Sequence, residues 1–337
     1  MSDTMVTEKS QGVDQTINLF DVGCLFNLNI GTWSGRKMLT EADLKKVGID
    51  PTGLPKDIVN YGRKLLVPKS ELQVMTKIEQ RARSYLSHWS VSFGAVNSHF
   101  VPFAMLPSVE QHLKDLKKEF YEAVDSFVPR FSDMKQIIQE KYGDFWEKCL
   151  KNHYPSNPRD LREKFKFEWF TFEIAGMRSI QEVSIEELAG KDRLRQERLK
   201  AQQEKMQEEV GSFVEEYVNV MRKETVEFCE LMTARINGNV YGDEKEAKQL
   251  TPRSLAMFKK YVDRFKQMNI FGDQETENML VEFRDKFLDV GIVPSDLEGA
   301  NIKKGITETL ASIKSQALNE GEDASQFINS LKRKVII

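Results

Sequence analysis

Apolar and polar residues alternate along residues 17–31, and this two-residue period predicts a half-buried strand with an irregularity at Gly23. Residues 89–103 return to a β-like pattern around an Asn97-Ser98 turn and predict a hairpin or an irregular strand pair. Residues 165–174 alternate again and are rich in aromatic side chains. We therefore expect three separated segments to form one small antiparallel sheet.

Steps of three and four between apolar residues predict helices in the regions between these strands. Thr40 and Asp43 have the spacing of a helix-capping box, and a longer helix is expected from Pro68 to about Ser87. A helix over residues 108–127 is expected to end at Pro129, and a second to follow over residues 132–149. The stripe of the helix over 108–127 consists of Val109, Leu113, Leu116, Phe120, Val124 and Phe127.

The longest helix signal extends from about Ser184 to Asn237 and contains a charged segment, Lys191–Glu209, with few apolar residues. Burial in a core cannot stabilise such a segment, so it is expected to project into water as a helical arm. We expect it to form a coiled-coil-like hairpin with the region 108–150. The predicted fold class is therefore α+β and mostly α, with the small sheet at the base of a long helical hairpin.

Four regions are predicted along the chain. Residues 1–16 are expected to be a disordered lead, and residues 17–104 an N-terminal α+β region. Residues 105–245 are expected to contain the helical hairpin with a β segment at 165–174. Residues 246–337 form a predicted C-terminal helical bundle, whose basic and apolar tail, Lys332–Ile337, is expected either to dock or to fray.

Composition narrows the possible functions. Charged residues make up 30% of the 337 residues, but the net charge is only −3, which does not indicate a polyanion-binding protein. Cys24, Cys149 and Cys229 are few and far apart, as expected of reduced cysteines in a cytoplasmic protein. No run of about 20 apolar residues predicts a membrane span, and the N-terminus lacks the apolar core of a signal peptide.

The sequence from Gly31 to Met38 invites comparison with a phosphate-binding loop, but three residues separate its glycines instead of four, and Met38 replaces the hydroxyl residue. The alternatives are a packed turn after a strand, or an exposed contact patch formed by Trp33, Arg36 and Lys37. Tryptophan and arginine are favoured anchors in interfaces. We predict that these three residues bind a protein partner.

No spacing in the chain indicates an enzyme, a metal site or a cofactor. His88, His99, His112 and His153 are dispersed, and no nucleophile elbow occurs. The aromatic run at 165–174 is typical of a sheet core. Its alternative interpretations are base stacking in a nucleic-acid-binding protein and a β-tongue in a helical pore-former, although Glu168 and Glu173 would be costly in lipid. Neither nucleic acid nor membrane is expected as a partner, whereas homo-oligomerisation stays open.

The run from Leu28 to Leu39 with its Trp-Ser-Gly-Arg-Lys core, followed by Glu41–Leu44, resembles the opening of an uncharacterised bacterial and phage domain family. Similarity continues through Leu54-Pro55, Gly62–Lys64, Arg81–Arg83 and the aromatic run, and covers about residues 17–240. The segment Gly94–Asn97 departs from the glycine-tryptophan pattern of that family.

The resemblance implies no reaction. Families of this kind are often encoded beside MoxR-type AAA+ ATPases and von Willebrand factor A-domain proteins. The resemblance therefore implies a non-enzymatic adaptor or scaffold that works with such an ATPase. The partner would then supply the energy, from ATP.

Overall fold

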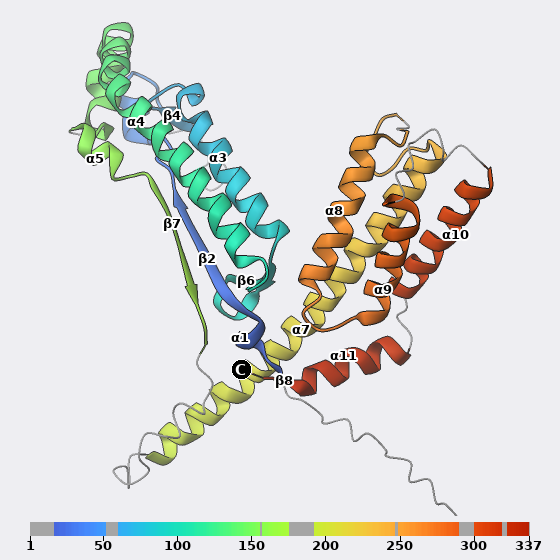
Figure 1. Ribbon diagram of the computed structural model, residues 1–337. Helices are drawn as coiled ribbons and strands as arrows, with labels where there is room; N and C mark the ends of the chain where they lie inside the picture. Colours follow the sequence, from blue (N-terminus) through green and yellow to red (C-terminus); the bar gives the residue numbers. More distant parts are fainter. Residues whose placement is uncertain are drawn as a thin grey trace, which may run out of the picture. The chain divides into compact units, whose positions relative to one another are not determined.

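The computed structural model describes residues 17–51, 60–155, 157–174, 192–246, 249–289, 300–318 and 322–336 (Figure 1). The predicted lead over residues 1–16 and the predicted cap at Ser184 lie outside the described residues. The chain divides into two compact units that interleave along the sequence. Unit 1 comprises residues 1–25, 90–105 and 172–337, and unit 2 comprises residues 26–89 and 106–171. Each unit is described by itself below.

Unit 2 is built on two long helices, α3 (Lys69–His88) and α4 (Leu106–Phe145), which pack along each other. Ion pairs join Arg81 to Glu119 and Glu71 to Arg130, so the numbers fall on α3 as they rise on α4. The two helices are therefore antiparallel. The predicted stripe of α4 is confirmed, because all six of its residues are buried, and α3 buries Met75, Ile78, Ala82 and Leu86.

Helix α4 continues through Pro129, so the predicted interruption there is wrong. Proline removes one backbone donor and clashes with the preceding turn, at a cost of about 3 kcal/mol. On both sides of Pro129 the helix buries apolar residues, including Phe127, Val128 and Phe131. This burial offsets the cost of the proline and keeps the helix intact.

The smaller elements of unit 2 precede α3 or follow α4. A loop separates α2 (Glu41–Lys46) from β4 (Arg63–Leu65), and part of it, residues 52–59, lies outside the described residues. After α4 come a π-helical turn, Trp146–Leu150, and a 3-10 turn, Lys151–His153. The remaining elements are β3 (Arg36–Met38), α2 (Glu41–Lys46), β4 (Arg63–Leu65), α5 (Pro158–Arg162) and β7 (Lys166–Phe172).

The predicted strand over residues 17–31 is divided in two. Strand β1 (Ile17–Asn18) is followed by a single helical turn, α1 (Leu19–Val22), and then by β2 (Gly23–Gly31). The turn forms because the Asn18 side chain accepts a hydrogen bond from the Phe20 backbone. Gly23 is the irregular position, because the helical turn ends and β2 begins there. A Cβ atom at this position would lie 2.4 Å from the ring of Phe100, so the close packing requires glycine.

Four strands form the main sheet in the order β5–β6–β2–β7, where β5 is Val91–Phe93 and β6 is Ser98–Pro102. β5 and β6 are antiparallel and form the predicted hairpin, with Asn97 in the left-handed conformation after a 3-10 turn. The predicted aromatic strand is β7, at the edge of the sheet. Phe165 and Phe167 are buried, whereas Phe170 and Phe172 are exposed, so only one end of the run contributes to a core.

Unit 1 contains the 46-residue helix α7 (Asp192–Asn237), which is followed along the chain by α8, α9, α10 and α11. α7 packs along α10 and α11, and it also contacts α8. Tyr217 of α7 donates a hydrogen bond to the Met268 carbonyl at 2.7 Å, and buried Arg264 pairs with Glu224. The other helices are α8 (Pro252–Met268), α9 (Gln274–Phe283, followed by a π-helical turn, Arg284–Leu288), α10 (Ala300–Ala317) and α11 (Glu322–Lys334).

The first part of α7 is the charged segment expected to be an arm. It is helical from Asp192, and the described side chains of residues 200–205 are exposed. Burial begins at Val210. The partner of this helix differs from the expected one, because α4 packs along α3 and α7 packs along α10. The apolar stripe of α4 is covered by that of α3, and the seam of α7 is covered by helices that follow it in the chain.

The C-terminal tail docks onto its own chain. β8 (Val335–Ile336) pairs in parallel with β1, with Ile17 opposite Val335. Val335 is fully buried, and Gln207 of α7 donates a hydrogen bond to its carbonyl. The mostly α, α+β class with a small antiparallel sheet is therefore confirmed, and the two ends of the described chain meet in unit 1.

Candidate functional site

The short ribbon formed by β3 and β4 places two arginines and two apolar side chains on one face. Arg36 lies opposite Leu65, and Met38 lies opposite Arg63. Directly paired residues of an antiparallel ribbon point to the same side, as do residues two apart in one strand. All four side chains are exposed, Met38 at 50% and Leu65 at 41%.

An open groove lies beside this ribbon, with a volume of about 490 Å³. Arg63 and Leu65 form one wall, and the C-terminal part of α4 forms the other. Clefts of about 300–1,000 Å³ are the size at which proteins commonly hold ligands. The α4 wall and the remaining lining consist of Ile137, Ile138, Lys141, Tyr142 and Phe145, with Leu39, Lys64, Val67, Pro68 and Leu150.

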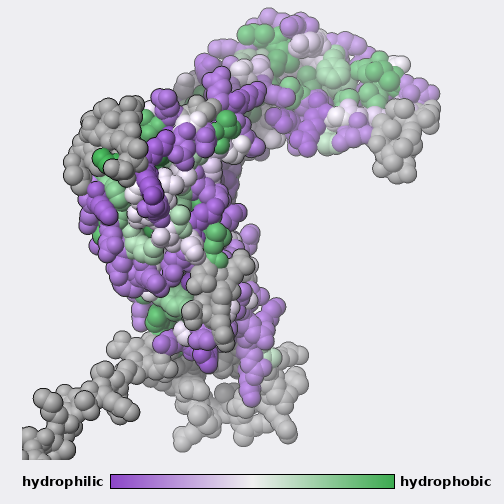
Figure 2. All heavy atoms as spheres, turned by 90° about the vertical axis from the view of Figure 1, so that its right-hand side faces the viewer, coloured by the Kyte–Doolittle hydropathy of each residue, from purple (hydrophilic) through white to green (hydrophobic). Residues whose placement is uncertain are grey.

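Exposed apolar side chains gather at this groove. Figure 2 shows hydrophobic residues interrupting a largely hydrophilic surface. Ile137 is 59% exposed and Tyr142 is 49% exposed. Single exposed apolar residues are ordinary, but a group such as Ile137, Tyr142 and Leu65 around one concavity is typical of an interaction surface.

Several cations lie at or beside the groove, and one of them, Lys64, is paired with Asp43. Within the described residues, Arg36, Arg63 and Lys141 make no ion pair, and Lys141 lies 5.4 Å from the centre of the Tyr142 ring. Elsewhere on unit 2, arginines are paired with carboxylates, as in Arg81–Glu119 and Arg162–Asp125. The cations other than Lys64 are thus available to an anionic partner.

The α4 wall has an irregular backbone. Tyr142 departs from helical geometry, with φ −119° and ψ 17°, and the π-helical turn Trp146–Leu150 follows. The turn is held by Trp146, which is buried and lies 4.5 Å, ring centre to ring centre, from Tyr154. π-helical turns are frequent at functional sites. Tyr142, the residue at the distortion, lines the groove.

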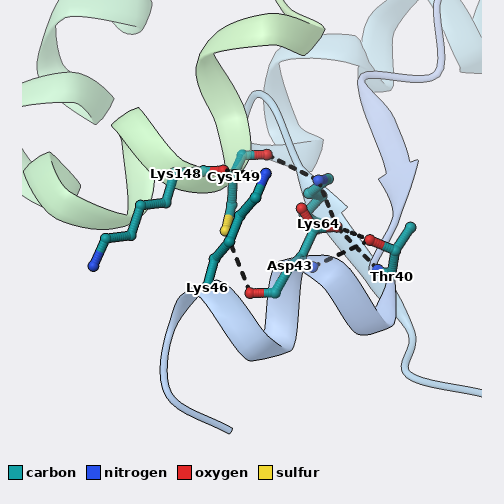
Figure 3. A network of polar contacts seen from close by, with 6 residues as sticks. All are labelled: Thr40, Asp43, Lys46, Lys64, Lys148 and Cys149. Atoms are coloured by element: carbon teal, nitrogen blue, oxygen red, sulfur yellow. Dashed lines mark hydrogen bonds and ion pairs between the residues drawn. The ribbon is translucent and has the colours of Figure 1, made fainter.

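A buried polar network supports the floor of the groove (Figure 3). The Lys64 ammonium donates to Asp43 and to the Cys149 carbonyl, each at 2.8 Å, and only 3% of the Lys64 side chain is exposed. Thr40 and Asp43 form the predicted capping box of α2. The Cys149 thiol donates to the Asp43 carbonyl, and Lys46 donates to the Lys148 carbonyl. The network therefore joins α2, β4 and the π-helical turn.

The electrostatics of this network follow from burial and hydrogen bonding. Burial alone would raise the pKa of Asp43, but hydrogen bonds from Lys64 and Thr40 outweigh it and lower this pKa to about 2. Burial, together with the negative charge of Asp43, raises the pKa of the Cys149 thiol. Asp43 is consequently ionised and Cys149 protonated at neutral pH, which suits a structural ion pair rather than a nucleophile.

The three predicted contact residues are separated by the fold. Trp33 is half-buried, and its ring centre lies 5.4 Å from that of Phe131 and 6.4 Å from that of Phe127 on α4. Arg36 is exposed on the face of the ribbon that carries Arg63 and Leu65. Lys37 is also exposed but lies opposite Lys64, on the other face of the ribbon. None of the three lines the groove, and only Arg36 shares a ribbon face with two residues that do, Arg63 and Leu65.

The loop before β3 is packed against apolar side chains. Gly35 has φ +59°, and a Cβ atom there would lie 2.9 Å from Leu72 and from Val67. The Gly35 carbonyl accepts a hydrogen bond from Leu66, and the Thr32 hydroxyl donates to Glu79. This geometry is that of a turn fitted onto α3 and β4.

The other candidate features stay apart from the groove. All three cysteines are buried, and none of them forms a disulfide, which agrees with their predicted reduced state. No cluster of three or more histidine, cysteine or acidic side chains suited to a metal occurs among the residues that the structure describes. None of the helices in the described ranges has the length and apolarity needed to cross a bilayer.

Sequence reasoning missed the groove itself. Ile137, Ile138 and Tyr142 fit an ordinary helical stripe, and Arg63–Leu65 is too short to stand out as a strand. One signal was available, because Ile137, Ile138 and Tyr142 lie beyond the reach of the 20-residue helix α3 that covers the first part of α4.

The chain was compared with known proteins. Residues 21–288 match the model of the family described as "Protein of unknown function (DUF3150)", so the chain belongs to this family. No curated protein and no solved structure matches it.

Proposed function

We propose that this protein is a non-enzymatic interaction protein that binds another protein through the groove between the β3–β4 ribbon and the end of α4. The observation that carries the proposal is the combination, around one concavity, of exposed apolar side chains with Arg63 and Lys141, which make no ion pair among the residues that the structure describes. Exposed apolar groups favour burial against a partner, and arginine and aromatic side chains are enriched among residues that dominate binding energy.

The partner that we propose is a MoxR-type AAA+ ATPase acting with a von Willebrand factor A-domain protein. This choice rests on the family resemblance of the Trp33–Lys37 region. Gly35, in the segment Gly31–Met38, is enclosed by Leu72 and Val67 and leaves no room for a phosphate on that side. This supports the view that the partner, and not this chain, binds the nucleotide. The exposed side chains among residues 200–205 of α7 offer a second helical surface for such an assembly.

Co-expression with an ATPase and an A-domain protein encoded beside this chain tests the proposal. We expect the proteins to elute together in size-exclusion chromatography. Replacing Ile137 and Tyr142 by serine should weaken the complex by about tenfold or more, since losing about 1.4 kcal/mol of binding free energy has that effect. Val74→Ser is the matched control, because Val74 is 52% exposed on α3 and does not line the groove.

Separate elution of all three proteins would contradict the proposed partnership. A complex that is equally insensitive to the groove and the Val74 substitutions would contradict the groove as its site. The two other interpretations from the sequence have tests of their own. Leakage of lipid vesicles would favour a pore-former, and a gel shift that weakens steeply with salt would favour a nucleic-acid-binding protein.

A further inference from the structure

The groove has a definite chemistry, which restricts the kind of partner segment it accepts. This inference rests on the proposed interaction function and adds the class of ligand. We infer that the groove binds an acidic amphipathic helix of another protein, whose apolar face covers the α4 wall and whose carboxylates meet Arg36 and Arg63.

The apolar half of the recognition comes from the lining. Ile137, Ile138 and Tyr142 lie on α4, and Leu65 faces them from β4. Aliphatic side chains gain from burial against other apolar side chains, at about 25 cal/mol per Å² of apolar surface. A phosphate backbone offers no such counterpart, so the lining favours a protein segment over a nucleic acid.

The charged half comes from the rim. Arg36 and Arg63 stand on the same face of the ribbon, and Lys141 stands on the opposite wall. None of the three makes an ion pair within the residues described. Arginine binds carboxylates through two parallel hydrogen bonds, and opposite charges at an interface also select against basic partners. Positive charge on both walls therefore favours acidic residues on both edges of the bound segment.

The shape of the site favours a helical segment. One wall is the end of a helix, where Ile137, Ile138, Lys141, Tyr142 and Phe145 follow steps of one, three and four. An amphipathic helix presents its apolar residues at similar spacing and packs against such a ridge. A second copy of this chain is a weaker fit, because its C-terminal helix α11 ends in Lys332, Arg333 and Lys334.

A selection from a random peptide library tests the inference without knowledge of the natural partner. Peptides of about 15 residues displayed on phage are selected on the full chain, and their affinities are then measured by fluorescence anisotropy. We expect the enriched peptides to be net acidic, with large apolar residues three or four positions apart. Their affinity should fall as the salt concentration rises.

Two variants locate the binding. Arg36→Glu combined with Arg63→Glu should weaken the selected peptides by about tenfold or more, whereas Lys37→Glu should change their affinity by less than about twofold. Lys37 is the matched control because it is an exposed cation of the same strand on the other face. Circular dichroism with an unchanged melting temperature verifies that each variant is folded.

Several outcomes would overturn the inference. One such outcome is a selection that enriches basic peptides or enriches no peptide at all. Another is peptide binding that is unchanged by the double arginine substitution. Binding of a short DNA duplex or of anionic lipid vesicles that depends on the same arginines, in place of peptide binding, would assign the groove to those ligands. If peptides bind as expected but the ATPase complex does not form, only the proposed partner is wrong.

Discussion

The two parts of α4 show how one helix serves two purposes. Before Pro129 its apolar residues are buried, and its neighbouring charges are paired, as in Arg81–Glu119 and Arg162–Asp125. After residue 136 it exposes Ile137 and Tyr142, bends at Tyr142, and lines the groove with Arg63, which makes no ion pair among the described residues. The first part holds unit 2 together, and the second is left open. The predictions below test this division.

The largest effect is expected in the first part of α4. Phe120→Ala removes a fully buried ring that packs against Phe165 and Phe167. The cavity should lower the free energy of unfolding by about 3–5 kcal/mol. Chemical denaturation measures this loss. Tyr142→Ala, which removes an exposed ring from the second part, is the control and should change stability by less than about 0.5 kcal/mol.

Lys64→Met should be similarly destabilising. It leaves the Asp43 carboxylate buried without its cation, which costs about 3–5 kcal/mol in comparable sites. Lys37→Met changes the residue directly opposite, which is exposed, and should be nearly neutral. Equal stability of the two variants in denaturation would show that the buried pair does not support the floor of the groove.

Lowering the pH should remove the contribution of the same network to the free energy of unfolding. The pKa of Asp43 is about 2 in the folded state and near its ordinary value of 3.8 when unfolded, so its contribution is complete above about pH 4. It is lost as the pH falls from about 4 towards 2, and amounts to about 2 kcal/mol. Denaturation of wild type and Asp43→Asn across this range measures it. The difference between the two proteins should shrink as the pH falls, and a constant difference would contradict the assignment.

Pro129 marks the boundary between the two parts of α4. Pro129→Ala restores the backbone donor and removes the ring clash, and proline's stiffening of the unfolded chain offsets only part of this gain. We expect the free energy of unfolding to rise by about 1–2 kcal/mol. Since Pro129 is exposed and lies outside the groove, peptide affinity should not change. A stability loss would indicate that the proline is required for the course of the helix.

The smallest effect is expected from the surface ion pairs. Arg81→Ala removes the partner of Glu119, and both side chains are about half exposed. Exposed pairs contribute about 0–1 kcal/mol, and salt screens them. Thermal melting in low and high salt should therefore show a small difference that disappears at high salt. A persistent loss would mean that the arginine contributes by packing.

Local patterns were sufficient to predict much of the fold. The capping box at Thr40, the buried stripe of α4 and the helical charged segment of α7 depend on neighbouring residues, and all three were recognised. The pairing of β8 with β1 and the choice of α3 as the partner of α4 depend on residues far apart in sequence, and periodicity does not contain them.

The candidate site was predicted only in part. Trp33, Arg36 and Lys37 adjoin in sequence, but a strand turns successive side chains to opposite faces, and a packed loop places Trp33 against Phe131. Of the three, Arg36 alone shares a ribbon face with Arg63 and Leu65, which line the groove. Tertiary structure brings Arg63 and Tyr142 to the groove. Arg63 is placed by the pairing of β3 with β4, and Tyr142 lies on the part of α4 that α3 does not cover.

The most direct test of the groove as the binding surface is hydrogen exchange of the full chain with and without its co-purified partner. We predict that binding slows exchange in residues 63–65 and 137–145 and leaves α3 unchanged. Protection confined to the first part of α7, or to any region other than the groove, would contradict this account.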